Sequence, residues 1–147
     1  MKLELKHINP YLPYGLKFVF TKEYYYPYPA MQKEGFTFTF DLIESPKVIY
    51  VNNIYKKWID MILEQDYFKP ILKPLSDLRD NKDFIRKFGG DNPNNLRMCN
   101  LDIDDLINNG LEFETYYGYY EWLIENHFDV FGLIEKNLAI DVNTLNK

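Results

Sequence analysis

The sequence predicts an α+β fold, in which an N-terminal antiparallel sheet is packed by two main helices and by short additional helices. Early in the chain, apolar residues alternate with polar ones, whereas later they recur every three or four residues. Strands followed by helices are the order typical of α+β proteins. The length of 147 residues indicates a single domain over 1–147, β-rich in 1–52 and mainly helical in 53–147.

The predicted sheet is built from four segments that are rich in alternating, aromatic or β-branched residues. They are residues 2–8, 16–21, 36–43 and 47–52. The third segment alternates most cleanly and places Phe38 and Phe40 on one face. The fourth follows Ser45-Pro46 at once, so the two are expected to pair as an antiparallel hairpin.

The two main helices are expected over 54–66 and 113–127, where apolar residues recur at helical spacing. The predicted core combines the inner strand face with the apolar stripes of both helices. It contains Phe38, Phe40, Trp58, Tyr120 and Leu123. Gly118 lies inside the second helix, at a cost of about 1 kcal/mol relative to alanine, which indicates that a neighbour needs the space.

Shorter elements are expected between the main helices. Pro70 and Pro74 exclude a helix over 67–75, so this segment is predicted to be extended. A helix is predicted over 77–88, ended by Gly89-Gly90. Residues 91–95 have the composition of a polar loop, and 102–109 that of a short turn of helix.

Charge disfavours nucleic acid as a partner. The net charge is −5, and residues 74–147 carry 14 acidic against 7 basic residues. Extended contact between this acidic part and a nucleic-acid backbone would be repulsive. The acidic surface is either a solvated face or a surface that meets a basic partner.

No apolar run is long enough to cross a membrane, and the N-terminus lacks a secretory h-region. The lone Cys99 excludes an internal disulfide and a cysteine-rich zinc site. A cytoplasmic protein without membrane contact is therefore expected.

Aromatic residues make up 18% of the chain, with 13 tyrosines and 11 phenylalanines. Four tyrosines gather in the segment Tyr24–Pro29, together with two prolines. Proline lowers the cost of ordering a loop, and tyrosine rings stack on bases or fill a partner's groove. The candidate binding residues are therefore Tyr24, Tyr25, Tyr26 and Tyr28; alternatively, these rings fold over the edge of the sheet.

His127 and Asp129 form the alternative polar site. A carboxylate that orients a histidine can create a general base. The same residues also suit a structural role, because histidine is favoured near a helix C-terminus and aspartate binds backbone amides in turns. The structural role is preferred, and no catalytic residue is assigned.

Two further patterns point to no chemistry. Asp102, Asp104 and Asp105 do not match a calcium loop, because Leu106 and Ile107 occupy positions that need an oxygen ligand and a glycine. Acids at a helix start explain the cluster. Cys99 lacks a basic neighbour other than Arg97, so it is expected to be inert. Neither a metal nor a cofactor is predicted.

Three stretches resemble a family of small proteins from Bacteroidetes and their phages or prophages. They are Pro10–Lys17 (PYLPYGLK), Lys69–Leu78 (KPILKPLSDL) and His127–Asp141 (HFDVFGLIEKNLAID). The resemblance spans the beginning, middle and end of the chain, with Asn137 where the family often has glycine. It implies a bacterial or phage cytoplasmic protein, and it implies no activity, catalytic residue or cofactor.

The leading hypothesis is a non-enzymatic accessory or interaction protein of a phage or mobile element, acting through contacts with a protein partner. It follows from the missing catalytic motifs and the aromatic surplus. One alternative is a small-ligand or nucleotide-binding domain that stacks its aromatic rings on the ligand. The other is a hydrolase or transferase that uses His127 and Asp129. The pattern leans against an enzyme and leaves the oligomeric state open.

Overall fold

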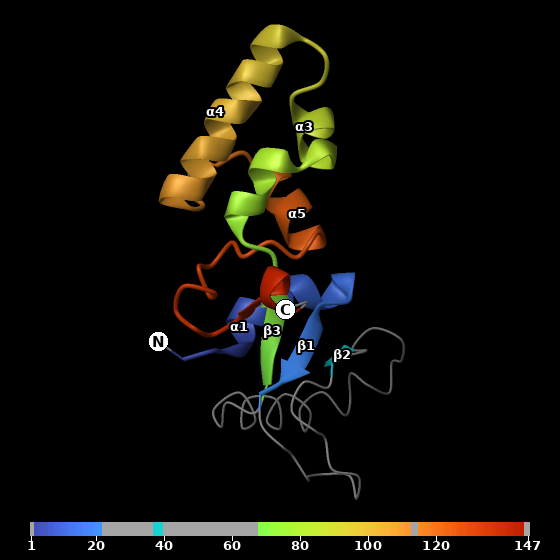
Figure 1. Ribbon diagram of the computed structural model, residues 1–147, viewed down its shortest axis with the longest axis vertical. Coiled ribbons are helices and arrows are strands. Elements are labelled where there is room, and N and C mark those ends of the chain that lie inside the picture. The colour runs from blue at the N-terminus through green and yellow to red at the C-terminus, as the bar shows by residue number, and fades with distance from the viewer. Residues whose placement is uncertain (1, 22–36, 40–67, 113–114, 146–147) are drawn as a thin grey trace, which may run out of the picture.

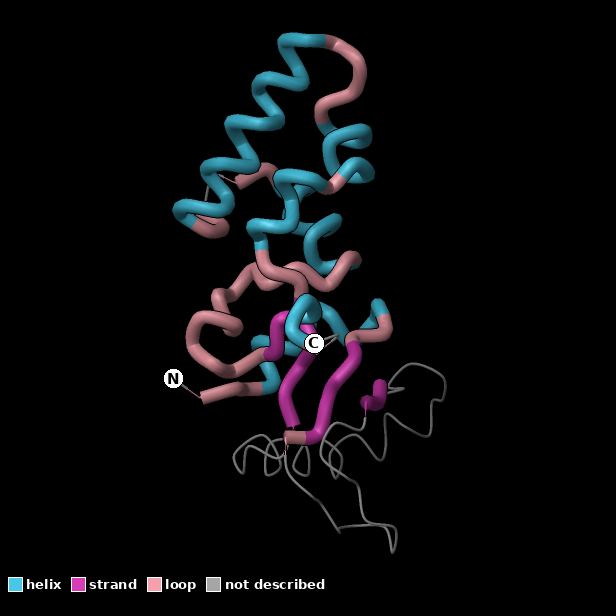
Figure 2. Tube along the Cα trace, in the orientation of Figure 1, coloured by secondary structure: helices cyan, strands magenta, loops and turns pink. Residues whose placement is uncertain are grey.

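A computed structural model of the chain describes residues 2–21, 37–39, 68–112 and 115–145, and these residues form an α+β fold (Figure 1). The sheet lies toward one end of the molecule and helices α3 and α4 lie at the other (Figure 2). The elements are α1 (Leu5–Ile8), η1 (Asn9–Tyr14), β1 (Lys17–Phe20), β2 (Thr37–Thr39), β3 (Phe68–Leu72), η2 (Leu75–Asp80), α3 (Lys82–Phe88), α4 (Pro93–Asn109), α5 (Tyr117–Glu125), β4 (Ile140–Asp141) and η3 (Val142–Thr144).

The sheet of the described residues has four strands in the order β2-β1-β3-β4, and it is mixed rather than purely antiparallel. β1 runs antiparallel to both β2 and β3, with Phe18 opposite Phe38 on one side and opposite Pro70 on the other. β4 runs parallel to β3. A parallel neighbour requires a long connection, which the chain supplies through η2, α3, α4 and α5.

Two of the predicted extended segments are confirmed as strands. β1 lies within 16–21, and β3 lies within the proline-containing segment 67–75. β2 confirms the strand over 36–43 at Thr37–Thr39. The rest of that strand, the strand over 47–52 and the helix over 54–66 lie outside the described residues, as do Phe40 and Trp58.

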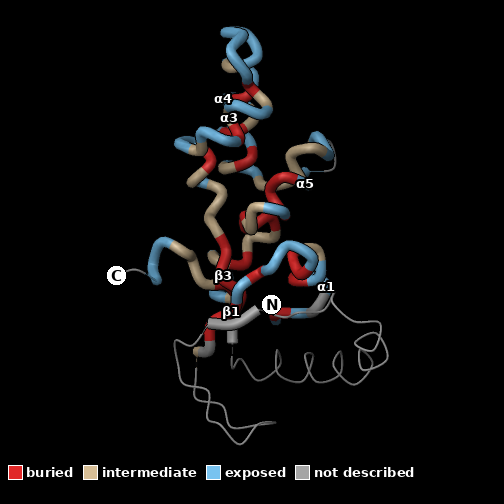
Figure 3. Tube along the Cα trace, turned by 90° about the vertical axis from the view of Figure 1, so that its right-hand side faces the viewer, coloured by how far each residue is buried: buried red, intermediate tan, exposed pale blue. Residues whose placement is uncertain are grey.

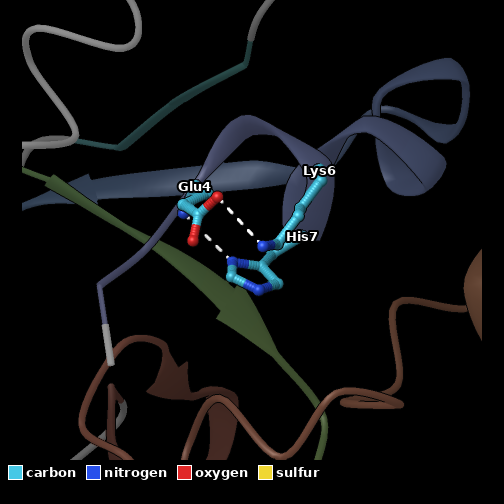
Figure 4. Close-up of polar contacts among 3 residues, drawn as sticks. All are labelled: Glu4, Lys6 and His7. Carbon is cyan, nitrogen blue, oxygen red and sulfur yellow. Dashed lines mark hydrogen bonds and ion pairs between the residues drawn. The ribbon is translucent and has the colours of Figure 1, made fainter.

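The prediction of a strand over 2–8 is wrong, because Leu5–Ile8 form α1 and the 3₁₀ helix η1 follows it directly. Local bonds close this turn: the amide of Glu4 donates to Nδ1 of His7 at 3.0 Å, and the amide of His7 donates to the carbonyl of Glu4 at 3.0 Å. An ion pair of 3.0 Å joins Lys6 to Glu4 (Figure 4). The buried Ile8, Tyr11 and Leu12 follow helical spacing, which the alternation of Leu3, Leu5 and His7 concealed.

The helix predicted over 77–88 is divided at Asn81 into η2 and α3. The backbone of Asn81 is extended, with φ −81° and ψ 99°, and its side chain accepts a 2.9 Å hydrogen bond from the amide of Phe84. Asn81 is therefore the N-cap of α3, and the extended cap residue interrupts the helical pattern.

The expected loop at 91–95 and short helix at 102–109 are replaced by one helix of 17 residues, α4. Asn92 caps it, since its side chain accepts hydrogen bonds from the amides of Asn94 at 2.9 Å and Asn95 at 3.3 Å. Pro93 follows at the first helical position, where its missing amide costs nothing. The acids at 102–105 consequently lie inside a helix and not at its start.

The helix predicted over 113–127 begins later and ends earlier, as α5. Leu123 is fully buried, as expected, whereas Tyr120 is half-buried. Tyr116 and Tyr117 were expected on the apolar face but are 62% and 67% exposed. The N-terminal end of α5 projects from the core, so its tyrosines meet solvent.

The core runs from the sheet into the helical end, with buried segments in β1, β3 and α5 (Figure 3). Phe84 lies at the centre of an aromatic cluster, with ring centroids 4.8 Å from Phe88, 5.3 Å from Tyr119 and 5.1 Å from Trp122. This packing holds α3 against α5. Among the described residues, no helix combines the length and the apolar character needed to cross a bilayer.

Candidate functional site

The two candidate sites from the sequence have different outcomes. Tyr24, Tyr25, Tyr26 and Tyr28 lie outside the described residues. His127 and Asp129 are described, and both follow α5, but each bonds to a different part of the chain.

His127 binds the end of η1. Its Nε2 lies 2.7 Å from the carbonyl oxygen of Tyr14, the last residue of that 3₁₀ helix. The histidine therefore meets a helix-terminal carbonyl, although of η1 and not of α5. Its backbone φ of 62° is left-handed, which marks the sharp turn out of α5. Burial lowers the pKa of the imidazole, and the hydrogen bond with the Tyr14 carbonyl offsets part of this decrease.

Asp129 is buried, with 5% of its surface exposed. Its Oδ1 accepts a hydrogen bond from the amide of Leu133, and its Oδ2 accepts one from the amide of Ile134, both at 2.8 Å. The carboxylate thus organises the turn that follows, as the sequence led us to expect. His127 and Asp129 share no hydrogen bond, so the geometry gives no oriented acid–base pair.

The thiol of Cys99 is buried on the inner side of α4. Burial is the main cause that raises its pKa, and the nearby Asp102 carboxylate raises it further. A thiol held protonated in this way is a poor nucleophile.

The acids of α4 take part in separate contacts. Asp102 accepts a hydrogen bond of 2.6 Å from the hydroxyl of Tyr119, and Asp105 accepts one of 2.7 Å from the side-chain amide of Asn109. Asp104 lies 3.4 Å from the guanidinium of Arg79, in an exposed ion pair. Asp102 and Asp105 therefore lie on one side of α4, and Asp104 lies on another.

Asp102 and Asp105 open onto a hollow of about 290 Å³ between α4 and the segment before α5, which we call the tyrosine hollow. Its lining combines acidic and aromatic side chains: Asp102, Asp105, Leu106, Glu112, Thr115, Tyr116 and Tyr119. Three of these seven residues are carboxylates and none is Lys, Arg or His. The hollow is consequently electronegative.

Gly118 holds the aromatic wall of the hollow in place. A Cβ atom at Gly118 would lie 2.5 Å from the ring of Tyr116, so the ring occupies the space that glycine leaves. The Tyr116 ring also packs edge-on against Tyr119, with centroids 5.2 Å apart and planes at 89°. The Tyr116 ring, although 62% exposed, is thus held in one orientation. It is the neighbour for which Gly118 leaves space, as the glycine in the predicted helix indicated.

Tyr119 fixes the carboxylate of Asp102, which lines the tyrosine hollow. Burial raises the pKa of its phenol, and the hydrogen bond to Asp102 raises it further. The hydroxyl therefore remains a donor and fixes one oxygen of Asp102. On the opposite rim, Thr115 Oγ1 accepts a 2.8 Å hydrogen bond from the amide of Glu112. This bond fixes the backbone of Glu112, whose side chain is exposed.

Exposed apolar side chains gather near the tyrosine hollow. Among the described residues, six large apolar side chains are exposed, and four of them are Met98, Leu101, Tyr116 and Tyr117. Met98 and Leu101 are 55% and 52% exposed. They share a side of α4 with Asp102 and Asp105, since these four residues recur at intervals of three and four.

Comparisons with protein-family models, with curated proteins and with solved structures found no match. The site therefore rests on its own geometry. The sequence does not predict the hollow, because its acids are typical of a helix start and its tyrosines follow the spacing of an apolar helix face. The signal that pointed to it was Gly118 within an aromatic run.

Proposed function

We propose that this chain is a non-enzymatic interaction protein that binds a basic segment of a protein partner through the tyrosine hollow and the adjoining side of α4. The observation that carries the proposal is the Tyr116 ring, which is exposed and yet held over Gly118 and against Tyr119. Gly118 is the second residue of α5, and a side chain there would displace the Tyr116 ring. The arrangement presents an ordered aromatic ring to solvent, as a binding site requires.

The composition of this surface matches that of protein interfaces. Tyrosine and methionine are enriched at interface cores, and tyrosine is frequent among the residues that dominate binding energy. Met98, Leu101 and Tyr116 supply exposed apolar area beside the hollow. Binding that covers these side chains removes apolar area from water.

Charge selects the class of partner. Asp102, Asp105 and Glu112 line the hollow, and none of the described lining residues is basic. Carboxylates pair with arginine and lysine, and arginine also stacks on aromatic rings such as that of Tyr116. A partner segment that carries arginine or lysine next to apolar side chains therefore complements this face, whereas a nucleic-acid backbone would be repelled.

The biological setting of this proposal is the cytoplasm of a bacterial cell, with the chain encoded by a phage or mobile element. The supporting observations are the resemblance of Pro10–Lys17, Lys69–Leu78 and His127–Asp141 to the Bacteroidetes and phage family, and the single cysteine. A contact of Tyr24, Tyr25, Tyr26 and Tyr28 with the same partner stays a prediction.

The test compares a paired surface variant with a matched control. The double variant Met98→Asp/Leu101→Asp places charge on the proposed face, and Leu145→Asp changes an exposed leucine elsewhere, which is 41% exposed. A partner captured from host lysate is purified, and its binding is measured by titration calorimetry. We expect one-to-one binding by the wild type and by Leu145→Asp, and at least about tenfold weaker binding by the double variant.

A second pair of variants tests the charge. The replacement Asp105→Lys/Glu112→Lys reverses the hollow, and Glu121→Lys/Glu125→Lys reverses two exposed acids of α5. Binding of the purified partner should weaken only for the first pair, and it should weaken for the wild type as salt is raised. Equal binding by the wild type and both double variants, or a partner without a basic segment, would contradict the proposal.

A further inference from the structure

A second and larger hollow, of about 470 Å³, lies on a different side of α4, at the C-terminal end of that helix. It is bounded by the last turn of α4, by the beginning of η2 and by the loop that follows α5, the loop whose turn Asp129 organises. We call it the α4-end hollow. Its volume lies within the range of small-ligand sites, about 300–1,000 Å³. Apolar walls are supplied by residues such as Ile107, Leu111 and Phe131.

The helix end makes this hollow electronegative. The last four carbonyls of a helix lack partners within the helix, and the helix dipole places partial negative charge there. The amide of Gly110 satisfies the carbonyl of Leu106 at 2.9 Å. Among the described residues, no donor reaches the carbonyls of Ile107, Asn108 or Asn109. All three residues line the α4-end hollow.

Two carboxylates add full charges. Asp129 is 5% exposed and Glu135 is exposed, and both line the hollow. None of the described residues that line it is Lys, Arg or His. Within the described part of the chain, neither carboxylate forms an ion pair. Lys136 is the next residue, but its Nζ binds the carbonyl of Phe131 at 3.1 Å. Among the described residues, the buried charge of Asp129 is thus met by two amides and by no cation.

We propose that the α4-end hollow binds a small organic cation, an ammonium group carried on an apolar body. The charged groups that line it are the carboxylates Asp129 and Glu135, which suit the donors of an ammonium ion, whereas the hydroxyl of Ser76 and the side-chain amides of Asn108 and Asn109 can donate or accept. The apolar walls suit a hydrocarbon or aromatic body. A hard divalent metal ion fits less well, because it needs six or more oxygen ligands and the described residues contain no group of three metal-binding side chains. This site shares only Leu106 with the described lining of the tyrosine hollow, and the proposal does not rest on the partner surface proposed above.

The probe is phenethylamine, and its neutral counterpart is 2-phenylethanol, which has the same body without the charge. Binding to the full chain is followed by ¹⁵N chemical-shift perturbation at neutral pH. We expect saturable shifts at Asn108, Gly110 and Gly132, with a dissociation constant on the order of 1 mM, as is typical of a small fragment. The alcohol should bind at least about tenfold more weakly.

Variants at exposed positions test the location without risking the fold. Asn108 is exposed and lines the hollow, so Asn108→Trp should fill it and abolish the shifts. Asn100→Trp is the matched control, since Asn100 is an exposed residue of the same helix outside the lining, and it should bind as the wild type does. Glu135→Gln should weaken binding several-fold, and Glu121→Gln should not.

Three results would overturn the proposal. The first is the absence of saturable shifts with phenethylamine at 10 mM, about ten times the expected dissociation constant. The second is equal binding of amine and alcohol, or unchanged binding by Asn108→Trp. The third is saturation of the same residues by Ca²⁺ or Mg²⁺ at concentrations where phenethylamine has no effect, which would identify a metal site instead.

Discussion

Tyr11 and Tyr116 belong to regions of the molecule that are built differently. Tyr11 is fully buried, and its hydroxyl donates to the carbonyl of Phe128 at 2.7 Å and accepts from the amide of Val130 at 3.2 Å. Beside it, Asp129 satisfies two more amides. Tyr116 is 62% exposed and packs on Gly118 and neighbouring rings, next to the carboxylates of the tyrosine hollow.

The difference separates residues that hold the fold from residues that are available for binding. Around Tyr11, the hydrogen bonds of the hydroxyl join distant segments and those of Asp129 close a local turn, and removing either set leaves buried groups without a partner. Around Tyr116, the polar groups face water, and removing one leaves the core unchanged. We therefore expect replacements in the Tyr11 region to change stability, and replacements in the tyrosine hollow to change binding.

The largest effect is expected for Asp129→Ala. The amides of Leu133 and Ile134 lose their acceptors in a buried turn, and hydrogen bonds to a charged group each contribute about 1.5–3 kcal/mol. The free energy of unfolding, measured by urea denaturation, should fall by about 3 kcal/mol or more. Glu135→Ala, in the same loop but exposed, is the control and should change it by less than about 0.5 kcal/mol. Equal losses in both variants would remove the distinction between the regions.

Tyr11→Phe should have the next largest effect. The ring stays buried, but the carbonyl of Phe128 and the amide of Val130 lose their partner. An unsatisfied buried group costs about 1–3 kcal/mol, so a decrease of about 2 kcal/mol is expected. Tyr14→Phe serves as the control in the same urea denaturation experiment, because Tyr14 is 45% exposed. A stable Tyr11→Phe protein would show that water replaces the hydroxyl.

Gly118→Ala should change the orientation of a ring more than the stability of the fold. The new Cβ would lie 2.5 Å from the Tyr116 ring, so the ring must move, while alanine favours the helix by about 1 kcal/mol. The free energy of unfolding should stay within about 1 kcal/mol of the wild-type value. The ring resonances of Tyr116 and Tyr119 should shift clearly in NMR spectra. Unchanged ring resonances would show that glycine does not position Tyr116.

The smallest effect concerns pH. Burial lowers the pKa of His127 in the folded protein below the ordinary histidine value of about 6.5, so the unfolded chain takes up a proton more readily. Stability is therefore complete above pH 6.5 and decreases as the pH falls below it. His127→Gln should reduce the slope of unfolding free energy against pH between about 7 and 5, the range where an ordinary histidine titrates. The pKa of His7 is also lowered, mainly by burial, so part of the slope should remain. An unchanged slope would contradict this assignment.

The sequence by itself determined the α+β class and the elements whose signal is local. β1 and the extended β3 follow from residue types and prolines within a few positions. The burial of Leu123 and the inference that Gly118 makes room for a neighbour follow in the same way. Hydrogen-bonding preferences and side-chain periodicity act over one or two turns, which is why such features are readable in the chain.

Only the tertiary structure decided the rest. Residues 5–8 form a helix despite the alternation in 2–8, because Ile8, Tyr11 and Leu12 pack into the core. Asn92 and Pro93 begin a long helix where a loop was expected. Tyr11 meets Phe128 across 117 positions, His127 meets Tyr14 across 113, and Asp102 meets Tyr119 across 17. No local pattern encodes such partners, because each contact depends on how whole elements pack, and packing is a property of the assembled core.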